Sequence, residues 1–492
     1  MRAMTLSNRQ KNITLASVFT FAGVLYCLIS LVNHYLFKTY TLDLGFYTHI
    51  MYDYAHFCID DFSILNRAPR CVLSDHFDLY LMLLSPLVYV FGTYTLLVVQ
   101  IVAVLLGGWG IYKLIGLYSD DDLMPIMATA TFFFSFGIIQ ALAFDYHSNV
   151  LTAMMLPWLL YFIKQKRYGL ASLFVILFVI GKENMSLWLF FVVTGLMWDY
   201  RKDKKTLWYL VGYAVFSMAY FFIINMVVMP ALGGAGGGFS RYAHLGNSYV
   251  EIAGRLLSHP GEAIRLLFAN TTDNPNYDGF KLDFYYCALA SGMLLVLIKP
   301  NYFWMLIPLI CQKMFASDWQ FWGVSLQYAV EFMPVLIITS FIVIVKLRNK
   351  ILQRGMAFAL LISVILTTFY TIGVPKAYYY LQKAGFGADR VCVYQGRHYE
   401  QAQFDARYAR ELIRQIPDDA SVCVSTVFVP HLALRDRIED FAWTTNTLAE
   451  YVLITDSYFG YERDGKPIFG NRDEFEVVAT DGTLYLFRRK QH

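Results

Sequence analysis

Long apolar runs separated by short polar segments repeat along the first three quarters of the chain. The runs lie at about residues 14–33, 93–117, 124–143, 149–163, 168–181, 185–198, 206–230, 284–298, 302–316, 324–345 and 355–374. An apolar helix of about 20 residues crosses the hydrocarbon core of a bilayer, and a shorter one suits a helix that stops at an internal cavity. The pattern predicts an all-α polytopic membrane protein of about eleven transmembrane helices over residues 1–374.

After residue 375 the long apolar runs give way to short ones. Residues 402–416 have a helical period and many charges, whereas residues 421–425 and 451–455 are typical of short buried strands. Residues 475–480 and 483–488 flank Asp481-Gly482, which is a strong hairpin signal. The sequence therefore predicts a small α/β domain over residues 375–492.

The basic residues indicate how the helices are oriented, because Lys and Arg are enriched in cytoplasmic loops. Basic clusters occur at residues 164–167, 201–205 and 346–354, with a single lysine at 299. All of these loops face the cytoplasm if the N-terminus is cytoplasmic and the run 79–91 is a surface helix rather than a span. We therefore expect outer loops at 34–92 and 231–283, and a C-terminal domain on the periplasmic or extracellular side.

The composition supports a protein of the bilayer and excludes other classes. Only 16% of the residues are charged and 57% are hydrophobic, whereas soluble domains carry roughly 25% charged residues. A net charge of +3 is too small to indicate a nucleic-acid partner. The seven cysteines match neither a redox motif nor a zinc motif. Cys58 and Cys71 share one outer segment, and a disulfide between them is an open alternative.

Two polar clusters lie where apolar runs meet, and an ionisable group costs so much in hydrocarbon that such clusters are candidates for function. Asp145 and His147 share a turn of very few residues at 144–147. Lys182 and Glu183 share another, and a lysine can hold a phosphate as a point charge. The structural alternative is an ion pair between Lys182 and Glu183 that only stabilises the turn.

Two acidic segments lie in the first outer loop. Asp43 follows the first apolar run closely and can act as a general base, although a solvated loop aspartate is the alternative. His76 and Asp78 are candidate ligands for a divalent cation such as Mg²⁺ or Mn²⁺, but their spacing matches no fixed metal motif. The structural alternative is that Asp75 caps the helix that follows.

A further polar group lies inside the apolar run 324–345. Gln327 and Tyr328 precede Glu331, which we expect one turn further along the same helix face. A carboxylate at this depth should face a cavity or a partner rather than lipid.

Together these segments resemble a family of bacterial polytopic membrane proteins, built on a domain of unknown function, that is similar to the GT-C glycosyltransferase superfamily. The matching stretches are 43–46, 76–78, Pro86 with Gln100, 144–147, 182–183, 241–242 with 245–248, 327–328 with Pro334, and 416–422 with 429–432 and Arg435. GT-C enzymes have a short cytoplasmic N-terminus and an acidic residue early in the first outer loop. A second acidic site lies between their third and fourth spans.

The resemblance implies a bacterial inner-membrane enzyme that moves a sugar from a polyprenyl-phosphate or polyprenyl-diphosphate carrier to an outer glycan, lipid or protein acceptor. By this analogy Asp43 is the catalytic carboxylate. Asp145 with His147 supports a metal ion or the donor phosphate. The residues that bind this phosphate are Lys182, Glu183, Arg241, Gln327 and Tyr328.

One departure from the superfamily concerns the metal, because Tyr146-His147 follows Asp145 where a second acidic residue is usual. Metal dependence is therefore open. Two other functions also stay open. One is a transporter or flippase of a lipid-linked precursor, and the other is a non-catalytic assembly protein of the envelope.

Overall fold

The computed structural model describes residues 7–58, 64, 71–234, 239–272, 274–373, 390–444, 446–459, 462–463, 466–467 and 469–490. Its packing divides the chain into two compact units, and each unit joins segments that are far apart in the sequence. We call them the helical unit (Met1–Tyr26 with Gln100–Val391) and the α/β unit (Cys27–Val99 with Cys392–His492). The predicted boundary between residues 374 and 375 lies outside the described residues and stays a prediction.

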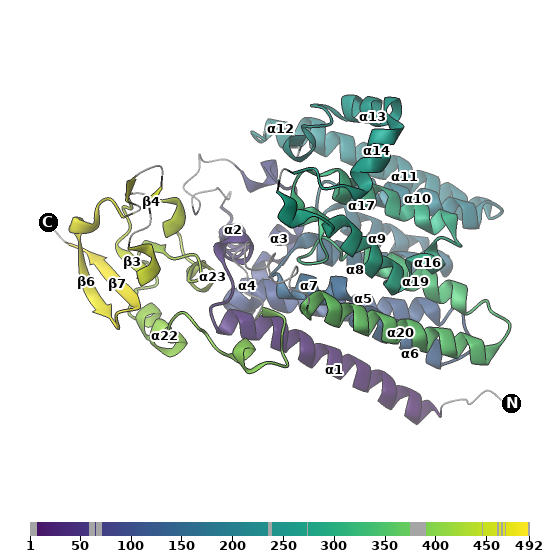
Figure 1. Ribbon diagram of the computed structural model, residues 1–492, viewed down its shortest axis with the longest axis horizontal. Helices are drawn as coiled ribbons and strands as arrows, with labels where there is room; N and C mark the ends of the chain where they lie inside the picture. The colour runs from purple at the N-terminus through teal and green to yellow at the C-terminus, as the bar shows by residue number, and fades with distance from the viewer. Residues whose placement is uncertain are drawn as a thin grey trace. The chain divides into compact units, whose positions relative to one another are not determined.

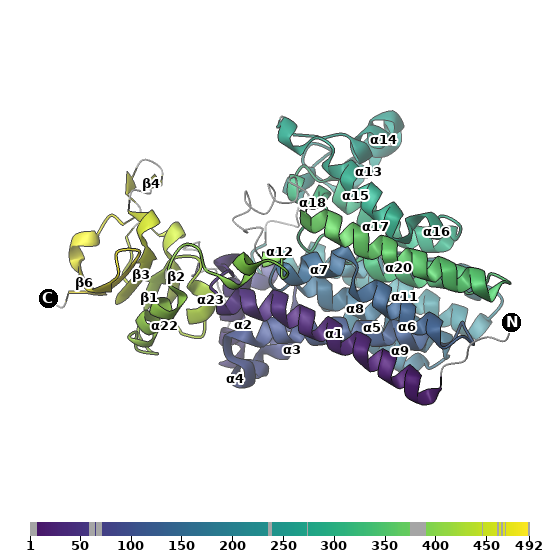
Figure 2. The same cartoon turned by 60° about the horizontal axis from the view of Figure 1, so that its bottom comes forward.

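The helical unit is a bundle of apolar helices, drawn from blue to green in Figures 1 and 2. Its elements are α5 (Thr95–Ile115), α6 (Leu123–Phe133), α7 (Phe136–Ala143), α8 (Ser148–Lys164), α9 (Tyr168–Val179), α10 (Met185–Tyr200), α11 (Lys204–Ile223), η6 (Ile224–Val228), α12 (Met229–Ala231), η7 (Phe239–Tyr242), α13 (Tyr249–Ser258), α14 (Pro260–Phe268), α15 (Phe280–Ala288), η9 (Leu289–Met293), α16 (Leu294–Val296), α17 (Pro300–Phe315), α18 (Trp319–Trp322), α19 (Phe332–Ile344) and α20 (Lys350–Gly373). Helix α10 packs between α11 and α17, and α20 packs on α6.

Two glycines let helix α5 approach its neighbours closely. A Cβ atom at Gly108 would lie 2.1 Å from the ring of Phe133 on α6. A Cβ at Gly107 would lie 2.5 Å from the sulfur of Met154 on α8. Small residues at helix contacts are typical of membrane helices, which gain stability from close van der Waals packing rather than from the hydrophobic effect.

Four helical stretches are long and apolar enough to cross a membrane: Asn8–Tyr35 (α1), Leu79–Ile115, Lys204–Ala231 and Lys350–Ile372. A fifth counts if α6 and α7, which are bent by 42° at their junction, form one span. Helices α9, α10 and α19 are apolar but shorter. Within the described ranges the chain thus has several candidate spans, and the total of about eleven stays a prediction.

The run 79–91, predicted to lie at the surface, is helical and belongs with α5 to the candidate span Leu79–Ile115, with a break in the backbone before α5, so its surface position stays a prediction. It contains α3 (Leu79–Leu84), η4 (Ser85–Leu87) and α4 (Val88–Phe91). The break comes at Gly92, where φ is +55°. Glycine suits this backbone conformation because it has no Cβ atom.

The predicted helix over 324–345 is wrong in its first third, because α19 begins only at Phe332. Residues 323–331 are buried bends and turns. Non-helical backbone at membrane depth needs partners inside the protein. Lys313 of α17 supplies them, since its ammonium donates to the carbonyl oxygens of Phe321, of Gly323 at 2.7 Å and of Tyr328 at 3.3 Å.

The α/β unit contains a five-stranded sheet in the order β2-β1-β3-β7-β6. The strands are β1 (Val422–Val424), β2 (Ile438–Asp440), β3 (Tyr451–Thr455), β6 (Phe475–Thr480) and β7 (Leu484–Arg489); β4 (Glu462–Arg463) pairs separately with β5 (Lys466–Pro467). Strands β1, β2 and β3 are parallel, with Val422 paired to both Ile438 and Tyr451. The predicted strands, the hairpin and the helix at 402–416, observed as α22 (Ala406–Arg414), are confirmed.

Segments of the first outer loop belong to the same unit as this sheet. They are η1 (Thr41–Gly45), α2 (Phe46–Ala55), α3 and α4. His49 of α2 is hydrogen-bonded through Nδ1 to the carbonyl oxygen of Ala433 at 3.1 Å. Cys58 and Cys71 are not joined by a disulfide in the described part of this loop. The first outer loop and the C-terminal domain therefore fold as one body.

Candidate functional site

The ten candidate residues fall into the two units. Asp43, His76 and Asp78 lie in the α/β unit. The helical unit carries the remaining seven, which are Asp145, His147, Lys182, Glu183, Arg241, Gln327 and Tyr328.

The turn that carries Asp145 and His147 is fixed by a side chain of helix α5. Gln100 is fully buried, and its Nε2 donates to the carbonyl oxygen of Asp145 at 2.5 Å. Its Oε1 accepts from the backbone N–H of His147 at 2.9 Å. Asp145 has a φ of +64°, a conformation that Asp adopts more readily than most residues. One glutamine thus holds both sides of the reversal between α7 and α8.

The Asp145 carboxylate is ion-paired with the guanidinium of Arg390. Sequence reasoning missed Arg390, which lies beyond the last apolar helix in a stretch with no recognisable pattern. A buried carboxylate is tolerated when an opposite charge and hydrogen bonds compensate for its lost hydration. Arg390 therefore provides the positive charge that Asp145 needs.

This arrangement does not fit a metal centre. The Asp145 carboxylate faces a guanidinium, and the ring of His147 stacks on Phe144 with centroids 5.0 Å apart. No group of three or more His, Cys, Asp or Glu side chains suited to a metal ion occurs within the described ranges. The cation expected from the resemblance thus has no ligand set among these residues.

Glu331, which directly precedes helix α19, contacts the first turn of α8. Its Oε1 accepts a hydrogen bond of 2.7 Å from Nδ2 of Asn149, in the first turn of α8. Lys313 and Lys182 are the cations whose charges act on this carboxylate. The expectation that Glu331 shares a helix face with Gln327 is wrong, because Gln327 precedes the start of α19.

Lys182 is the half-buried cation of the turn between α9 and α10. Its ammonium makes no hydrogen bond or ion pair with any residue in the described part of the chain. The alternative of an ion pair with Glu183 is therefore not observed. Instead the charge of Glu183 acts on the phenols of Tyr220 and Tyr249. The ammonium of Lys182, whose charge acts on Glu331, therefore retains hydrogen-bond donors for a further partner.

Arg241, Gln327 and Tyr328 form a second cluster. The guanidinium of Arg241 lies over the ring of Phe321 at 5.0 Å, and its Nε is 3.8 Å from a carboxylate oxygen of Asp318. Tyr328 stacks on the same Phe321 ring with centroids 4.1 Å apart. Gln327 is buried, and no described group hydrogen-bonds its Oε1. Arg241 and Tyr328 thus share the ring of Phe321, and Gln327 directly precedes Tyr328 in the chain.

In the α/β unit, the segment of Asp43 is docked on the carboxyl ends of the parallel strands. The backbone N–H of Thr41 donates to Oγ1 of Thr426, just after β1, at 3.2 Å. A Cβ atom at Gly45 would lie 2.8 Å from Val429 and 3.2 Å from the backbone nitrogen of Pro430. Asp43 itself is half-buried between these two anchors. Ligands of open α/β sheets bind at this edge.

Asp440, at the end of β2, stabilises this docking. Burial raises the pKa of its carboxyl, and the nearby side chains of Thr41 and Thr426 oppose the rise. The backbone N–H of Ala442 also donates to Asp440 at 2.8 Å. Sequence reasoning missed Asp440, because β2 has only three residues.

Asp78 has a structural role. Its carboxylate accepts a 2.9 Å hydrogen bond from the backbone N–H of Tyr80 and caps helix α3. The alternative that Asp75 is the cap is not observed, because the extended backbone that precedes the helix is at Asp78. Asp75 is exposed and His76 is half-buried.

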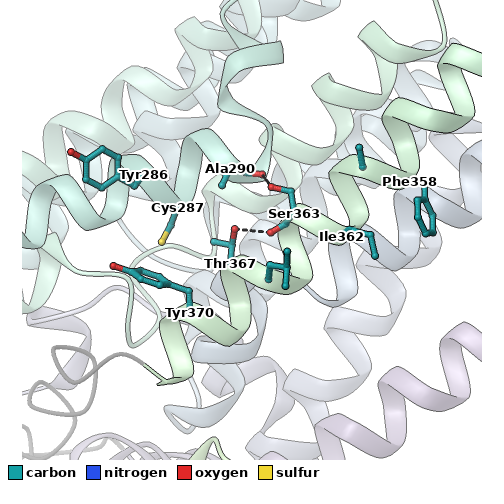
Figure 3. A pocket seen from close by; sticks show the side chains of 10 residues that line it. Tyr286, Cys287, Ala290, Phe358, Ile362, Ser363, Thr367 and Tyr370 are labelled. Carbon is teal, nitrogen blue, oxygen red and sulfur yellow. Dashed lines mark hydrogen bonds between the residues drawn. The ribbon is translucent and has the colours of Figure 1, made fainter.

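An apolar groove of about 700 Å³ lies between α15–η9 and α20 (Figure 3). Tyr286 and Cys287 line one side, and Phe358 and Ile362 line the other. The hydroxyl of Ser363 donates to the carbonyl oxygen of Ala290 at 2.7 Å, which leaves it little capacity for a ligand. With no charged lining residue, the groove suits an apolar chain and not a phosphate.

The family model for a predicted membrane protein (DUF2079) matches residues 33–469. No curated protein matches the chain. Among solved structures, ArnT from Cupriavidus metallidurans bound to undecaprenyl phosphate is 11% identical, covering 96% of this chain and 97% of that chain at a TM-score of 0.47. The apo state of the same protein is also 11% identical, covering 94% and 97% at 0.45. Both TM-scores lie below 0.5, so neither comparison establishes a shared fold.

Proposed function

The chain belongs to the DUF2079 family of predicted membrane proteins, and we propose that it is a GT-C-like glycosyltransferase with a polyprenyl-phosphate-linked sugar as donor. The observation that carries the proposal is the ammonium of Lys182. It lies at the join of two apolar helices and makes no hydrogen bond or ion pair with the described residues. A half-buried cation with unused donors at a membrane-helix end suits the phosphate of a lipid.

The other charged groups of the helical unit support this role. Asp145 is paired with Arg390, and Glu331, on which the charge of Lys182 acts, accepts a hydrogen bond from Asn149. Arg390 is thus committed to Asp145, whereas the ammonium of Lys182 has donors left for an incoming anion. A lipid donor keeps its apolar chain in the bilayer while its phosphate stays near the interface. A charge-assisted hydrogen bond to that phosphate contributes about 1.5–3 kcal/mol.

The proposed transfer is a single displacement with inversion at the anomeric carbon. The acceptor hydroxyl oxygen bonds to the anomeric carbon while the bond from that carbon to the phosphate oxygen breaks. The phosphate leaves with the electron pair, and Lys182 stabilises its charge. A carboxylate must take the proton of the acceptor hydroxyl, and the resemblance assigns this role to Asp43. Catalysis by this scheme needs no metal ion.

The membrane placement completes the proposal. Several apolar helices are long enough to span, and the inner loops of the predicted orientation are basic. We place the protein in a bacterial inner membrane with the α/β unit on the outer side. A polyprenyl-linked sugar is then the appropriate donor, because nucleotide sugars are cytoplasmic whereas lipid carriers present sugars across the bilayer.

A binding measurement in nanodiscs tests the role of Lys182, with undecaprenyl phosphate and its uncharged alcohol undecaprenol as probes. We expect the wild type to prefer the phosphate, and Lys182→Ala to weaken phosphate binding about 10- to 100-fold. Lys202→Ala, in an exposed basic loop, is the matched control and should change nothing. Equal affinity for both lipids, or unchanged phosphate affinity in folded Lys182→Ala protein, contradicts the proposal.

A further inference from the structure

Two short helices after the third candidate span carry exposed apolar side chains. Helices α13 and α14 form a hairpin, which Figure 2 shows beside α15 and α17. Val250 and Leu257 of α13 are 81% and 82% exposed. Ile264 and Phe268 of α14 are exposed as well. We name residues 249–268 the amphipathic hairpin.

Local sequence signals explain why the hairpin folds. Ser248 caps α13 by accepting from the backbone N–H of Glu251 at 3.2 Å. The carboxylate of Glu251 reaches back to the N–H of Asn247 at 2.9 Å. This reciprocal arrangement is a variant of the capping box. Pro260 opens α14, where its missing N–H costs nothing.

Each helix presents three different faces. On α13, Ile252 and Leu256 pack against the cluster of Leu245, Leu266 and Phe315. A polar face follows Glu251, Arg255 and Ser258, and Arg255 is ion-paired with Glu262 of α14 at 2.9 Å. The third face is apolar, at positions 250, 253, 254 and 257 on α13 and 261, 264 and 268 on α14. The first face contacts protein and the second suits water, so the third is the one that needs a partner.

The hairpin is continuous with the apolar surface of the candidate spans. The ring of Tyr249 packs on Phe221 of α11, with centroids 5.6 Å apart. The next residues of that span include the exposed Met226 and Val227. At the other end, Phe268 packs on Tyr285 of α15 at 5.2 Å. Exposed apolar residues in a span face lipid, so the end of the hairpin that packs on α11 adjoins lipid-facing surface.

We propose that the amphipathic hairpin lies in the membrane interface, with its third face inserted among the lipid chains of the leaflet around the 221–227 end of α11. The polar face of Arg255 and Glu262 then meets headgroups and water. This is the arrangement of interfacial amphipathic helices, which bury one apolar face at the boundary between headgroups and chains. The occupant is bilayer lipid, whatever reaction the protein catalyses.

A fluorescence measurement tests the proposal on the full-length chain in nanodiscs. The background lacks the native cysteines, and a polarity-sensitive dye is attached to Leu257→Cys or Ser258→Cys. These neighbours form a matched pair, because they differ mainly in the face they occupy. Val215→Cys on α11 is the lipid-facing reference, and Leu448→Cys in the α/β unit is the exposed reference outside the candidate spans; both residues are exposed.

We expect the dye at 257 to emit at shorter wavelength than the dye at 258. It should also be quenched by nitroxide-labelled lipids as strongly as the dye at 215. Quenching by aqueous iodide equal to that at 448 would overturn the proposal. Insensitivity to both quenchers would also overturn it, in favour of a protein partner. Val250→Cys repeats the test if labelling at 257 disturbs folding.

Discussion

The carboxylate of Asp145 and the guanidinium of Arg390 form an ion pair that is almost closed to solvent, with side chains 2% and 3% exposed. The pair joins the turn before α8 to the segment that follows α20. Removing one partner of a buried pair leaves an uncompensated charge, which is more destabilising than removing both. The ion pair therefore predicts that substitutions of Asp145 and Arg390 have non-additive effects on the free energy of unfolding.

We expect Arg390→Met to lower the free energy of unfolding by about 3–5 kcal/mol. Adding Asp145→Leu should restore much of this loss, because no isolated charge is then buried. Thermal melts of both single variants and the double variant in the same detergent measure the coupling. If the two losses simply add, the pair is not coupled.

Lys313 should be essential for the non-helical segment before α19. In Lys313→Met the carbonyl oxygens of Phe321, Gly323 and Tyr328 lose their common donor. An unsatisfied buried polar group costs about 1–3 kcal/mol. We therefore expect a large drop in melting temperature and new protease cleavage near residue 325. The control is Lys299→Met, because Lys299 is a half-buried lysine of the same unit. This variant should lower the melting temperature much less. If Lys313→Met protein is as stable as this control, then other groups donate hydrogen bonds to these carbonyl oxygens.

The α/β unit should lose stability in mild acid. The ring of His431 stacks on His34 at 4.1 Å and contacts Phe37 at 4.2 Å. Burial, together with the nearby Arg410 charge, holds the pKa of His431 well below its usual value. A depressed pKa means that the unfolded state takes up a proton first as the pH falls. The contribution of neutral His431 to the free energy of unfolding is thus fully present above about pH 6.5. It is lost as the pH falls below this value.

Melting temperatures from pH 8 to pH 5 test this prediction. His431→Phe keeps an aromatic ring and removes the titration, so its melting temperature should fall less on acidification. His56→Gln, at an exposed histidine, is the control and should follow the wild type. An identical pH dependence in His431→Phe would assign the acid sensitivity to other groups.

Thr426 should position the Asp43 segment for catalysis. Its hydroxyl donates to Oγ1 of Thr41 at 3.1 Å and accepts from the Thr41 N–H. We expect Thr426→Val to lower kcat about 10-fold or more, with the donor KM little changed, because misplacement of a proton acceptor affects the chemical step. Thr426→Ser keeps the hydroxyl and should recover kcat. A change confined to KM, or no recovery with serine, would contradict a positioning role.

Much of the architecture follows from hydrophobic patterning. The apolar runs correctly place most helices, and Asp481-Gly482 correctly predicts the last hairpin. The pattern fails at residues 324–331, where apolar composition suggests helix. There Lys313 of α17 donates to the carbonyl oxygens of Gly323 and Tyr328, which flank the first part of this non-helical stretch. Composition carries no sign of such a long-range donor.

In the candidate site, too, patterning identifies some residues and misses others. The turns of Asp145 and Lys182 stand out because polar residues interrupt apolar runs. Arg390 and Asp440 have no such context, since each lies in a short or irregular segment of the C-terminal part. Their roles depend on partners more than 240 and almost 400 residues away, Asp145 and Thr41. Only the folded chain reveals these pairs.

Turnover by the Asp43→Asn variant tests the central claim most directly. Purified protein in nanodiscs is mixed with a panel of polyprenyl-phosphate sugars and a membrane extract as acceptor source, and loss of the lipid-linked sugar is followed. Asp78→Asn is the matched control, because asparagine also caps a helix and the fold should persist. We predict that the wild type and Asp78→Asn consume a donor, whereas Asp43→Asn is slower by about 10² or more with donor binding retained. Near-normal turnover in Asp43→Asn, or no donor consumed by a wild type that still binds polyprenyl phosphate, would contradict the account.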